Sequence, residues 1–246
     1  MTRWIVLLCL AAAACGVQID GRPGATPDGT PTGDGPITGD PDSAPRCSNG
    51  RVVFLNFEGA TLNRAAVSDA TQNQASWMNI SQGTAPRYKA GASNRDQQIQ
   101  AITDGVRAQL SSFPITVVTT RPVNGPYVMI VFGGIATQVG SNYGGAVNTL
   151  DCGDAQKSDL AWISDNVSPT QRVVNYAVGA IGFGIGLTAT TDPLDCMCGW
   201  DNACIQDQTG ACRLSPQIAR DPAANQVCAG LTTQDEVAAF DAAFCR

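Results

Sequence analysis

The distribution of cysteine constrains the fold of this chain more than any other feature. Ten of its 246 residues are cysteine, and those after Cys9 and Cys15 form an even set. In an exported protein such a set indicates disulfides, with about a hundred possible pairings between which the sequence does not choose. Most of them follow residue 195, so we expect residues 196–246 to be a loop-dominated, disulfide-rich part of the domain. The set consists of Cys47, Cys152, Cys196, Cys198, Cys204, Cys212, Cys228 and Cys245.

Metal binding is the alternative use of these cysteines. The spacing from Cys196 to Cys212 lacks the paired Cys-x-x-Cys of a zinc ribbon, and an oxidising compartment favours disulfides, so we expect no zinc. The acidic string from Asp201 to Asp207 is a weak candidate for structural Ca²⁺. It lacks the spacing of an EF-hand, and solvated loop acids are the preferred interpretation.

The first residues of the chain are typical of an export signal. Arg3 supplies a positive charge, and residues 4–14 are apolar or small throughout. This order predicts a signal peptide over residues 1–14. The run is shorter than the roughly 20 apolar residues that a membrane-spanning helix needs, so an uncleaved anchor is the weaker alternative.

The residues around Cys15 carry a second prediction. The string Ala12-Ala13-Ala14-Cys15-Gly16 resembles the lipobox of bacterial lipoproteins. That resemblance implies that Cys15 receives acyl chains such as palmitate, becomes the mature N-terminus and anchors the chain to a membrane of the cell envelope. A secreted protein without lipid is the alternative. Because Gly16 is not an aspartate, the resemblance favours the outer membrane over the inner one.

Residues 15–46 form a predicted linker. They are mainly Gly, Pro, Thr and Asp and include no aromatic residue, so they cannot bury enough apolar surface to offset the entropy of ordering. Residues 47–246 then have the usual size of one domain. The chain carries a net charge of −6 and no basic patch, which argues against nucleic-acid binding, because that relies on clustered cations.

Apolar periodicity predicts the order of the structural elements. Short β-branched and aromatic runs predict strands over residues 51–57, 115–120, 127–132 and 160–164, with a loop over 140–145. Helical spacing predicts helices over residues 63–78, 96–113 and 168–187, the last with Ser168 as its N-cap. A capping box over residues 233–236 predicts a C-terminal helix. Together these elements predict an α+β domain with a mixed, twisted sheet and helices on one face.

One stretch is unusually rich in glycine. Residues 178–189 read Val-Gly-Ala-Ile-Gly-Phe-Gly-Ile-Gly-Leu-Thr-Ala, and Asp-Pro-Leu-Asp-Cys-Met follows at 192–197. With the order of the elements before it, this stretch resembles the secreted zinc metallopeptidases of the metzincin type. Those carry His-Glu-x-x-His-x-x-Gly-x-x-His on a helix and a Met turn beyond it. The resemblance implies a metzincin-like core with Gly186 as the glycine of the motif and Met197 as the Met-turn residue.

In this alignment the three zinc ligands and the general base of the motif are all replaced. The zinc-ligand positions fall on Gly179, Phe183 and Ala189, and the general-base position falls on Ala180. None of these side chains binds Zn²⁺ or takes a proton from water. The resemblance therefore implies a degenerate member with no catalytic residue and no cofactor, in which Phe183 fills the former metal volume. A buried helix whose glycines allow close packing on the sheet is a compatible interpretation.

Composition limits the other routes to catalysis. The chain contains no histidine, which excludes His-ligated zinc as well as Ser-His-Asp and Cys-His centres. A Ser-Lys centre would need Lys89 or Lys157, and neither lies in a recognisable motif. We assign structural roles to the two glutamates, Glu58 at a strand end and Glu236 in a helix cap.

Paired aspartates are the remaining candidates for an acid-base centre. Asp192 with Asp195, or Asp151 with Asp154, could share a proton as in aspartic proteases. No Asp-Thr-Gly or Asp-Ser-Gly signature is present, and surface-loop acids are the preferred interpretation.

These observations predict a lipid-anchored envelope protein that binds a protein or peptide in a former substrate cleft without cutting it. The alternatives are a structural envelope lipoprotein with no ligand and a hydrolase with a centre that uses no histidine. A cavity lined by converging acids would favour the hydrolase, and a closed apolar one would favour the structural protein.

Overall fold

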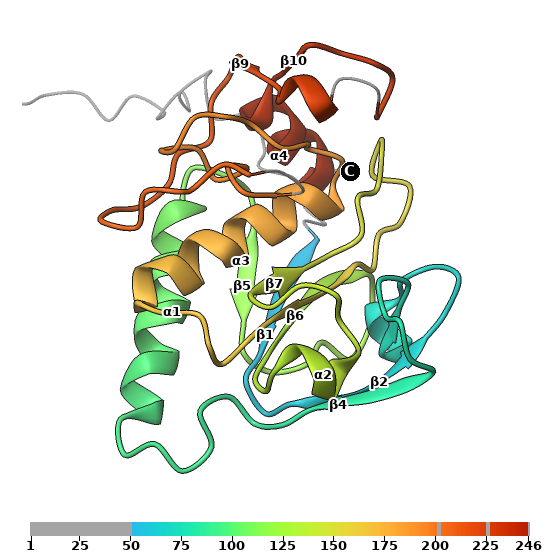
Figure 1. The fold of residues 1–246 in the computed structure, drawn as a ribbon, viewed down its shortest axis with the longest axis vertical. Helices are drawn as coiled ribbons and strands as arrows, with labels where there is room; N and C mark the ends of the chain where they lie inside the picture. Colours follow the sequence, from blue (N-terminus) through green and yellow to red (C-terminus); the bar gives the residue numbers. More distant parts are fainter. Residues whose placement is uncertain (1–50, 201–202, 225–226, 246) are drawn as a thin grey trace, which may run out of the picture. The chain divides into compact units, whose positions relative to one another are not determined.

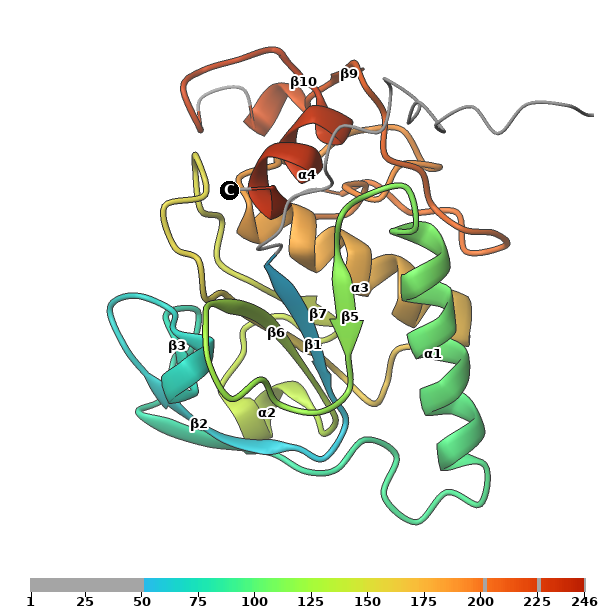
Figure 2. The same cartoon turned by 180° about the vertical axis from the view of Figure 1, so that it is seen from behind.

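The computed structural model describes residues 51–200, 203–224 and 227–245, and Figures 1 and 2 show them from opposite sides. The predicted signal peptide, Cys15, the linker and Cys47 lie outside the described residues, as do the first two residues of the calcium candidate. The described part is mixed α/β, in agreement with the predicted α+β class.

The central element is a five-stranded mixed sheet in the order β5-β1-β6-β8-β7. Strands β5, β1, β6 and β8 are parallel neighbours, and β7 at the edge runs antiparallel to β8. The sequence prediction placed four of these strands correctly and missed β7. The bounds are β1 (Val52–Asn56), β5 (Thr116–Val118), β6 (Tyr127–Phe132), β7 (Ala146–Val147) and β8 (Leu160–Ile163).

Both faces of this sheet are buried, which explains why its strands are continuous apolar runs. On one face Val53, Leu55 and Ile130 belong to a core that includes residues of the long helices. Alternate residues such as Phe54 and Met129 belong to a second core on the other face, as the period of two along a strand requires. Four helices occur in the described residues: α1 (Arg95–Gln109), α2 (Ala136–Val139), α3 (Thr170–Gly184) and α4 (Glu236–Phe244).

Helices α1 and α3 lie on the same side of the sheet and contact each other (Figures 1 and 2). Helix α4 lies against the C-terminal half of α3, where Phe240 approaches Gly182. The second face is covered by α2 and a small sheet. That small sheet comprises β2 (Ala60–Arg64), β3 (Gln74–Ala75) and β4 (Gln82–Ala85), and a separate pair is formed by β9 (Ile218–Ala219) and β10 (Thr233–Gln234).

The predicted helix over residues 63–78 is wrong. This segment contains the end of β2, a short 3-10 helix (Ala70–Gln72) and β3. The Asp69 carboxylate accepts a hydrogen bond from the Thr71 N–H, and Asn73 adopts a left-handed conformation with φ of 55°. Such local side-chain hydrogen bonds compete with helix formation.

The predicted ends of the helices also differ from the structure. Helix α3 begins at Thr170, one residue after Pro169, because Pro169 has an extended backbone (φ −71°, ψ −179°) and stands as the N-cap in place of Ser168. It ends at Gly184 before the left-handed Gly186. Helix α1 ends at Gln109, before residue 113, and α4 has Asp235 as its N-cap, since that side chain accepts from the Ala238 N–H.

Three disulfides join described cysteines and confirm that these residues form bridges: Cys152–Cys228, Cys196–Cys212 and Cys198–Cys204. Cys245 is disulfide-bonded as well. Cys196–Cys212 and Cys198–Cys204 tie residues 196–212 into two small loops that follow α3 in the chain. The segment that the sequence analysis expected to be rich in disulfides is therefore also the one that borders the C-terminal half of this helix.

Candidate functional site

A pocket of about 470 Å³ opens between the edge strand β7, helix α3 and the segment that ends at Trp200. Strand β7 and the residue after it contribute Ala146, Val147 and Asn148. Helix α3 contributes Tyr176 and Phe183, which stand two turns apart. The site therefore combines the free edge of a sheet with the face of a helix.

The backbone of β7 offers hydrogen-bonding groups at this edge. The Ser164 N–H donates to the Gly145 oxygen, and the register pairs Ala146 with Ile163. Because hydrogen-bonded and non-hydrogen-bonded pairs alternate in an antiparallel ladder, the N–H and C=O of Ala146 point away from β8. In agreement, the Ile163 oxygen accepts from the Gly133 N–H on the opposite side of β8. An extended segment could pair with Ala146 beside the pocket.

Four aromatic side chains line the pocket. Phe183 and Trp200 lie with ring centroids 5.3 Å apart and an interplanar angle of 31°, and both are nearly buried. Tyr176 lies against Gly145, and Tyr143 at the rim is 53 % exposed. None of the residues that line the pocket is charged, so its chemistry is that of an apolar, aromatic recess.

The structure fills the position at which the resemblance places the first zinc ligand. A Cβ atom built on Gly179 would lie 2.1 Å from Trp200 Nε1 and 2.6 Å from the Cys196 oxygen. No side chain fits there without displacing Trp200. Ala180 and Ala189 are buried and do not line the pocket. The residues present therefore do not fit a zinc ion held as in the metzincins.

Asn148 closes the base of the pocket. Its Nδ2 donates to the Ala180 oxygen at 2.8 Å, and its Oδ1 accepts from the Thr149 N–H. Both amide atoms are therefore engaged, and the Nδ2 bond holds the end of β7 against α3. Asn148 therefore lines the pocket with an amide group whose two polar atoms are already hydrogen-bonded.

The end of α3 is fixed by glycine and methionine. Gly186 has φ of +95°, and a Cβ there would lie 2.8 Å from the Asp151 oxygen. Met197 is fully buried, and a Cβ added to Gly182 would lie only 2.7 Å from its Sδ atom. Gly186, singled out from the sequence, thus permits the turn that follows α3. Met197, also singled out there, packs against Gly182 near the end of this helix.

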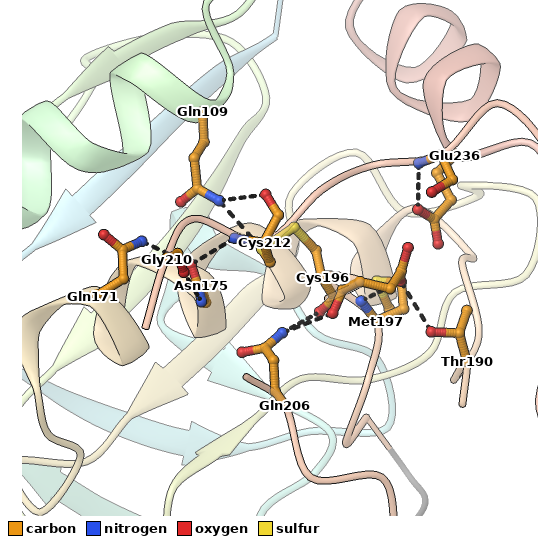
Figure 3. Close-up of a disulfide and its surroundings, with 12 residues drawn as sticks. Gln109, Gln171, Asn175, Thr190, Cys196, Met197, Gln206, Gly210, Cys212 and Glu236 are labelled. Atoms are coloured by element: carbon orange, nitrogen blue, oxygen red, sulfur yellow. Dashed lines mark hydrogen bonds between the residues drawn. A yellow bond between two sulfur atoms is a disulfide. The ribbon is translucent and has the colours of Figure 1, made fainter. Parts of the chain in front are cut away.

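Amide side chains hold the Cys196–Cys212 disulfide against the helices (Figure 3). Asn175 of α3 is fully buried; its Oδ1 accepts from the Cys212 N–H, and its Nδ2 donates to the Gly210 oxygen. Gln109 of α1 donates to the Cys212 oxygen. Gln206 donates to the Asp195 oxygen from the other side. These contacts fix the segment that carries Trp200.

The acids with raised pKa values lie away from the pocket. Burial raises the pKa of Glu236 to about 8, and it also raises the pKa of Asp195, which contacts Glu236. Burial raises the pKa of Asp159 to about 8, although the Arg51 guanidinium at 2.9 Å opposes the rise. None of these three lines the pocket.

The aspartate pairs considered from the sequence do not form in the structure. Asp192 is half-buried and accepts from the Leu194 N–H, which together with Arg213 lowers its pKa. Asp195 faces Glu236 and not Asp192.

In the second pair, Asp154 forms an ion pair with Arg51 at 2.5 Å and another with Lys157. Asp151 accepts from the Gln156 N–H through its own carboxylate. Both acids are therefore engaged with separate partners.

Glu58 has the structural role expected of it. It pairs with Arg95 at 2.8 Å and with Arg87 at 2.7 Å, and the Arg95 contact is the main reason that its pKa is lowered. Glu236 is not only a cap residue, because it is fully buried and faces Asp195. The sequence analysis missed this contact, since 41 residues separate the two acids.

No protein-family model and no curated protein matches the chain. Within the described ranges, no helix is both long and apolar enough to cross a bilayer. The same residues contain no cluster of three or more His, Cys, Asp or Glu side chains suited to hold a metal ion.

Sequence reasoning found Phe183 and missed the rest of the pocket wall. The wall comes from three separate segments, which contribute Tyr143 and Ala146, Tyr176, and Trp200 respectively. One available signal was the glycine run at 179–186, which the sequence-based interpretation took as allowing close packing on the sheet. It did not identify Trp200.

Proposed function

We propose that this domain is a catalytically inactive relative of the metzincin peptidases that binds an extended peptide segment in the pocket beside β7. The observation that carries the proposal is an open aromatic recess directly beside the outward-facing backbone of Ala146. A peptide strand can add to such an edge through main-chain hydrogen bonds while alternate side chains enter pockets. The recess would accept one large apolar side chain.

The absence of acids from the pocket wall supports binding over hydrolysis. A general acid or base has to lie within hydrogen-bond reach of the bond that it helps to break. The pocket wall offers aromatic rings, aliphatic groups and an amide that is already engaged by Ala180. The recess is also open, whereas a structural protein without a ligand would fill it with its own side chains.

The position in the cell remains part of the proposal. The leader and the lipobox-like string at Cys15 support an acyl anchor at the bacterial envelope, most consistent with the outer membrane. The Gly/Pro-rich residues after Cys15 would hold the domain away from the lipid surface. A peptide segment of another envelope protein would then be the natural class of ligand.

A pair of glycine variants tests the binding site. Gly144 lines the pocket and Gly210 does not, and a Cβ on either would meet no atom within 4 Å. We expect the unaltered protein, in detergent, to select peptides with a large apolar residue from a phage-displayed random library. Gly144→Trp should weaken the selected peptides at least tenfold by filling the pocket mouth, whereas Gly210→Trp should leave their affinity unchanged. Equal binding by both variants contradicts the proposed site.

A second measurement tests inactivity. The purified protein should contain no stoichiometric zinc and should not cleave unfolded casein, with or without a chelator. Chelator-sensitive cleavage would show that the alignment of α3 with the metallopeptidase motif is wrong.

A further inference from the structure

Two carboxyl groups face each other in the interior below the pocket. Asp195 stands in the segment after α3, and Glu236 is the first residue of α4. Both residues are 0 % exposed, and the two side chains lie close enough for each to affect the charge of the other. Neither acid has an ion-pair partner among the described residues. Two charged carboxylates in such a place would repel each other strongly.

The hydrogen bonds around the pair leave one position for a proton. Asp195 Oδ1 accepts from Thr190 Oγ1 at 3.0 Å and from the Met197 N–H at 2.8 Å (Figure 3). On Glu236, Oε2 accepts from the Ser215 N–H and Oε1 accepts from Gln234 Nε2. Asp195 Oδ2 is buried and has no hydrogen-bond partner among the described residues. A proton shared with Glu236 would satisfy it.

The charged groups nearby are engaged elsewhere. Asp192 lies close enough to disfavour a charge on Asp195, and it pairs with Arg213. Arg220 reaches Thr188 and several backbone oxygens, which leaves it outside the pair. Asp235 caps α4 through the Ala238 N–H. Within the described part of the chain, no cation therefore compensates the two acids.

The pair is joined to the pocket by a short covalent path. Asp195 begins the stretch that continues through Met197 to Gly199 and Trp200, and the last two line the pocket. The Met197 N–H is held by the Asp195 carboxylate itself. The position of Asp195 against α4 thus helps to set the position of the Trp200 ring.

We propose that Asp195 and Glu236 share one proton, and that this proton is a pH-sensitive latch that holds the Trp200 wall of the pocket against α4. The effect of the latch on ligand binding rests on the proposed function. The shared proton and its effect on Trp200 do not.

The direction of the pH effect follows from burial. Desolvation raises the pKa of Glu236 from its ordinary 4.5 to about 8. An acid whose pKa is higher in the folded state stabilises the fold when it is protonated. The contribution is fully present below about pH 4.5 and is lost as the pH rises through about 8. Above that pH both groups would be charged, and the segment at 195–200 would loosen from α4.

The composition of the chain allows a direct test. Glu58 and Glu236 are its only glutamates, so the full chain labelled with ¹³C at the glutamate side-chain carboxyl gives two carbon signals in an NMR pH titration. A Glu58→Gln variant assigns them. We expect the Glu58 signal to titrate below its ordinary range and the Glu236 signal to titrate near pH 8. A Glu236 signal that titrates below pH 5 would overturn the shared proton.

Fluorescence of Trp200 tests the coupling to the pocket, with Trp200→Phe as the subtraction control. We expect a Trp200-dependent change with a midpoint near pH 8. Glu236→Gln should abolish it, because the amide donates to Asp195 at every pH, and Glu58→Gln at the exposed glutamate should preserve it. A Glu236 titration without a change at Trp200 would overturn the latch. Neither readout uses a ligand, so a failed peptide selection would count only against the proposed function.

Discussion

At the scale of single residues, the turn after α3 depends on one backbone conformation. Gly186 has φ of +95°, a value that residues with a side chain rarely adopt, and a Cβ there would meet backbone atoms of residues 151 and 153. These atoms cannot move without displacing the loop that contains Cys152. The residue that the sequence alignment selected as the motif glycine is thus required by the shape of the turn alone.

We predict that Gly186→Ala lowers the free energy of unfolding by about 1–3 kcal/mol, the usual cost of one strained backbone position. Gly144→Ala is the matched control: its Cβ would meet no atom within 4 Å, and its effect should stay within about 0.5 kcal/mol. Urea unfolding followed by far-UV circular dichroism measures both. Equal stability of the two variants would show that the turn relaxes freely.

Gly179 and Trp200 show which side chain occupies the position that the resemblance assigns to a zinc ligand. The indole nitrogen lies over Gly179, and the ring lies tilted beside Phe183. The resemblance implied that Phe183 would fill this volume, whereas Trp200 is the residue directly over Gly179. The sequence did not indicate Trp200 because this residue lies in a disulfide-bonded segment whose path only the structure shows.

At the scale of elements, the three disulfides that join two described cysteines comprise one that closes a long loop and two that close short ones. Cys152–Cys228 spans 76 residues, whereas Cys198–Cys204 spans 6. In the chain-entropy description, a bridge stabilises more when it constrains a longer loop in the unfolded state. The long bridge connects the loop before β8 to the segment before β10.

We predict that replacing both Cys152 and Cys228 by Ser destabilises the domain by about 4–5 kcal/mol, against about 2 kcal/mol for the Cys198 and Cys204 pair. Urea unfolding at one pH measures both double variants. The short bridge should instead matter for the pocket, because Gly199 and Trp200 lie inside its loop. A larger loss of stability for the short bridge would contradict this division of roles.

The edge strands of the five-stranded sheet, β5 and β7, differ in how far their backbone groups are already used. At β5 the Arg107 side chain donates to the Val117 oxygen, so a backbone acceptor near that edge is already used. At β7 the strand is only two residues long and faces the pocket. A short edge strand resists unwanted pairing, and a groove beside it can select one kind of segment.

At the scale of the whole molecule, the leader and the domain make separate predictions. If Cys15 is lipidated, the exported chain should incorporate labelled palmitate and sediment with membranes. Cys15→Ser should abolish the labelling and release the protein in soluble form, because the acyl chains supply the membrane affinity. Cys9→Ser, in the apolar run of the leader, is the control that should keep the label. Labelling of Cys15→Ser would reject the lipid anchor.

Local pattern determined much of the main sheet and its two long helices. The strand at Tyr127–Phe132 was predicted to the residue, and those at β1 and β8 to within a residue or two, because strands buried on both faces are continuous apolar runs. Helix α1 was visible through its apolar face, and the even number of cysteines indicated bridges. The absence of histidine also excluded whole classes of catalytic centre.

Only the tertiary structure decided which residues meet. The two-residue strand β7 and the small sheet at β2–β4 carry no periodic signal, since their stability comes from partners distant in the sequence. The same holds for Asp195 with Glu236 and for Trp200 over Gly179. The sequence by itself determined four strands of the main sheet, the two long helices and the absence of any imidazole group, because these are local properties. Which side chains form the pocket and the buried acid pair depended on long-range packing, and only the folded chain supplies it.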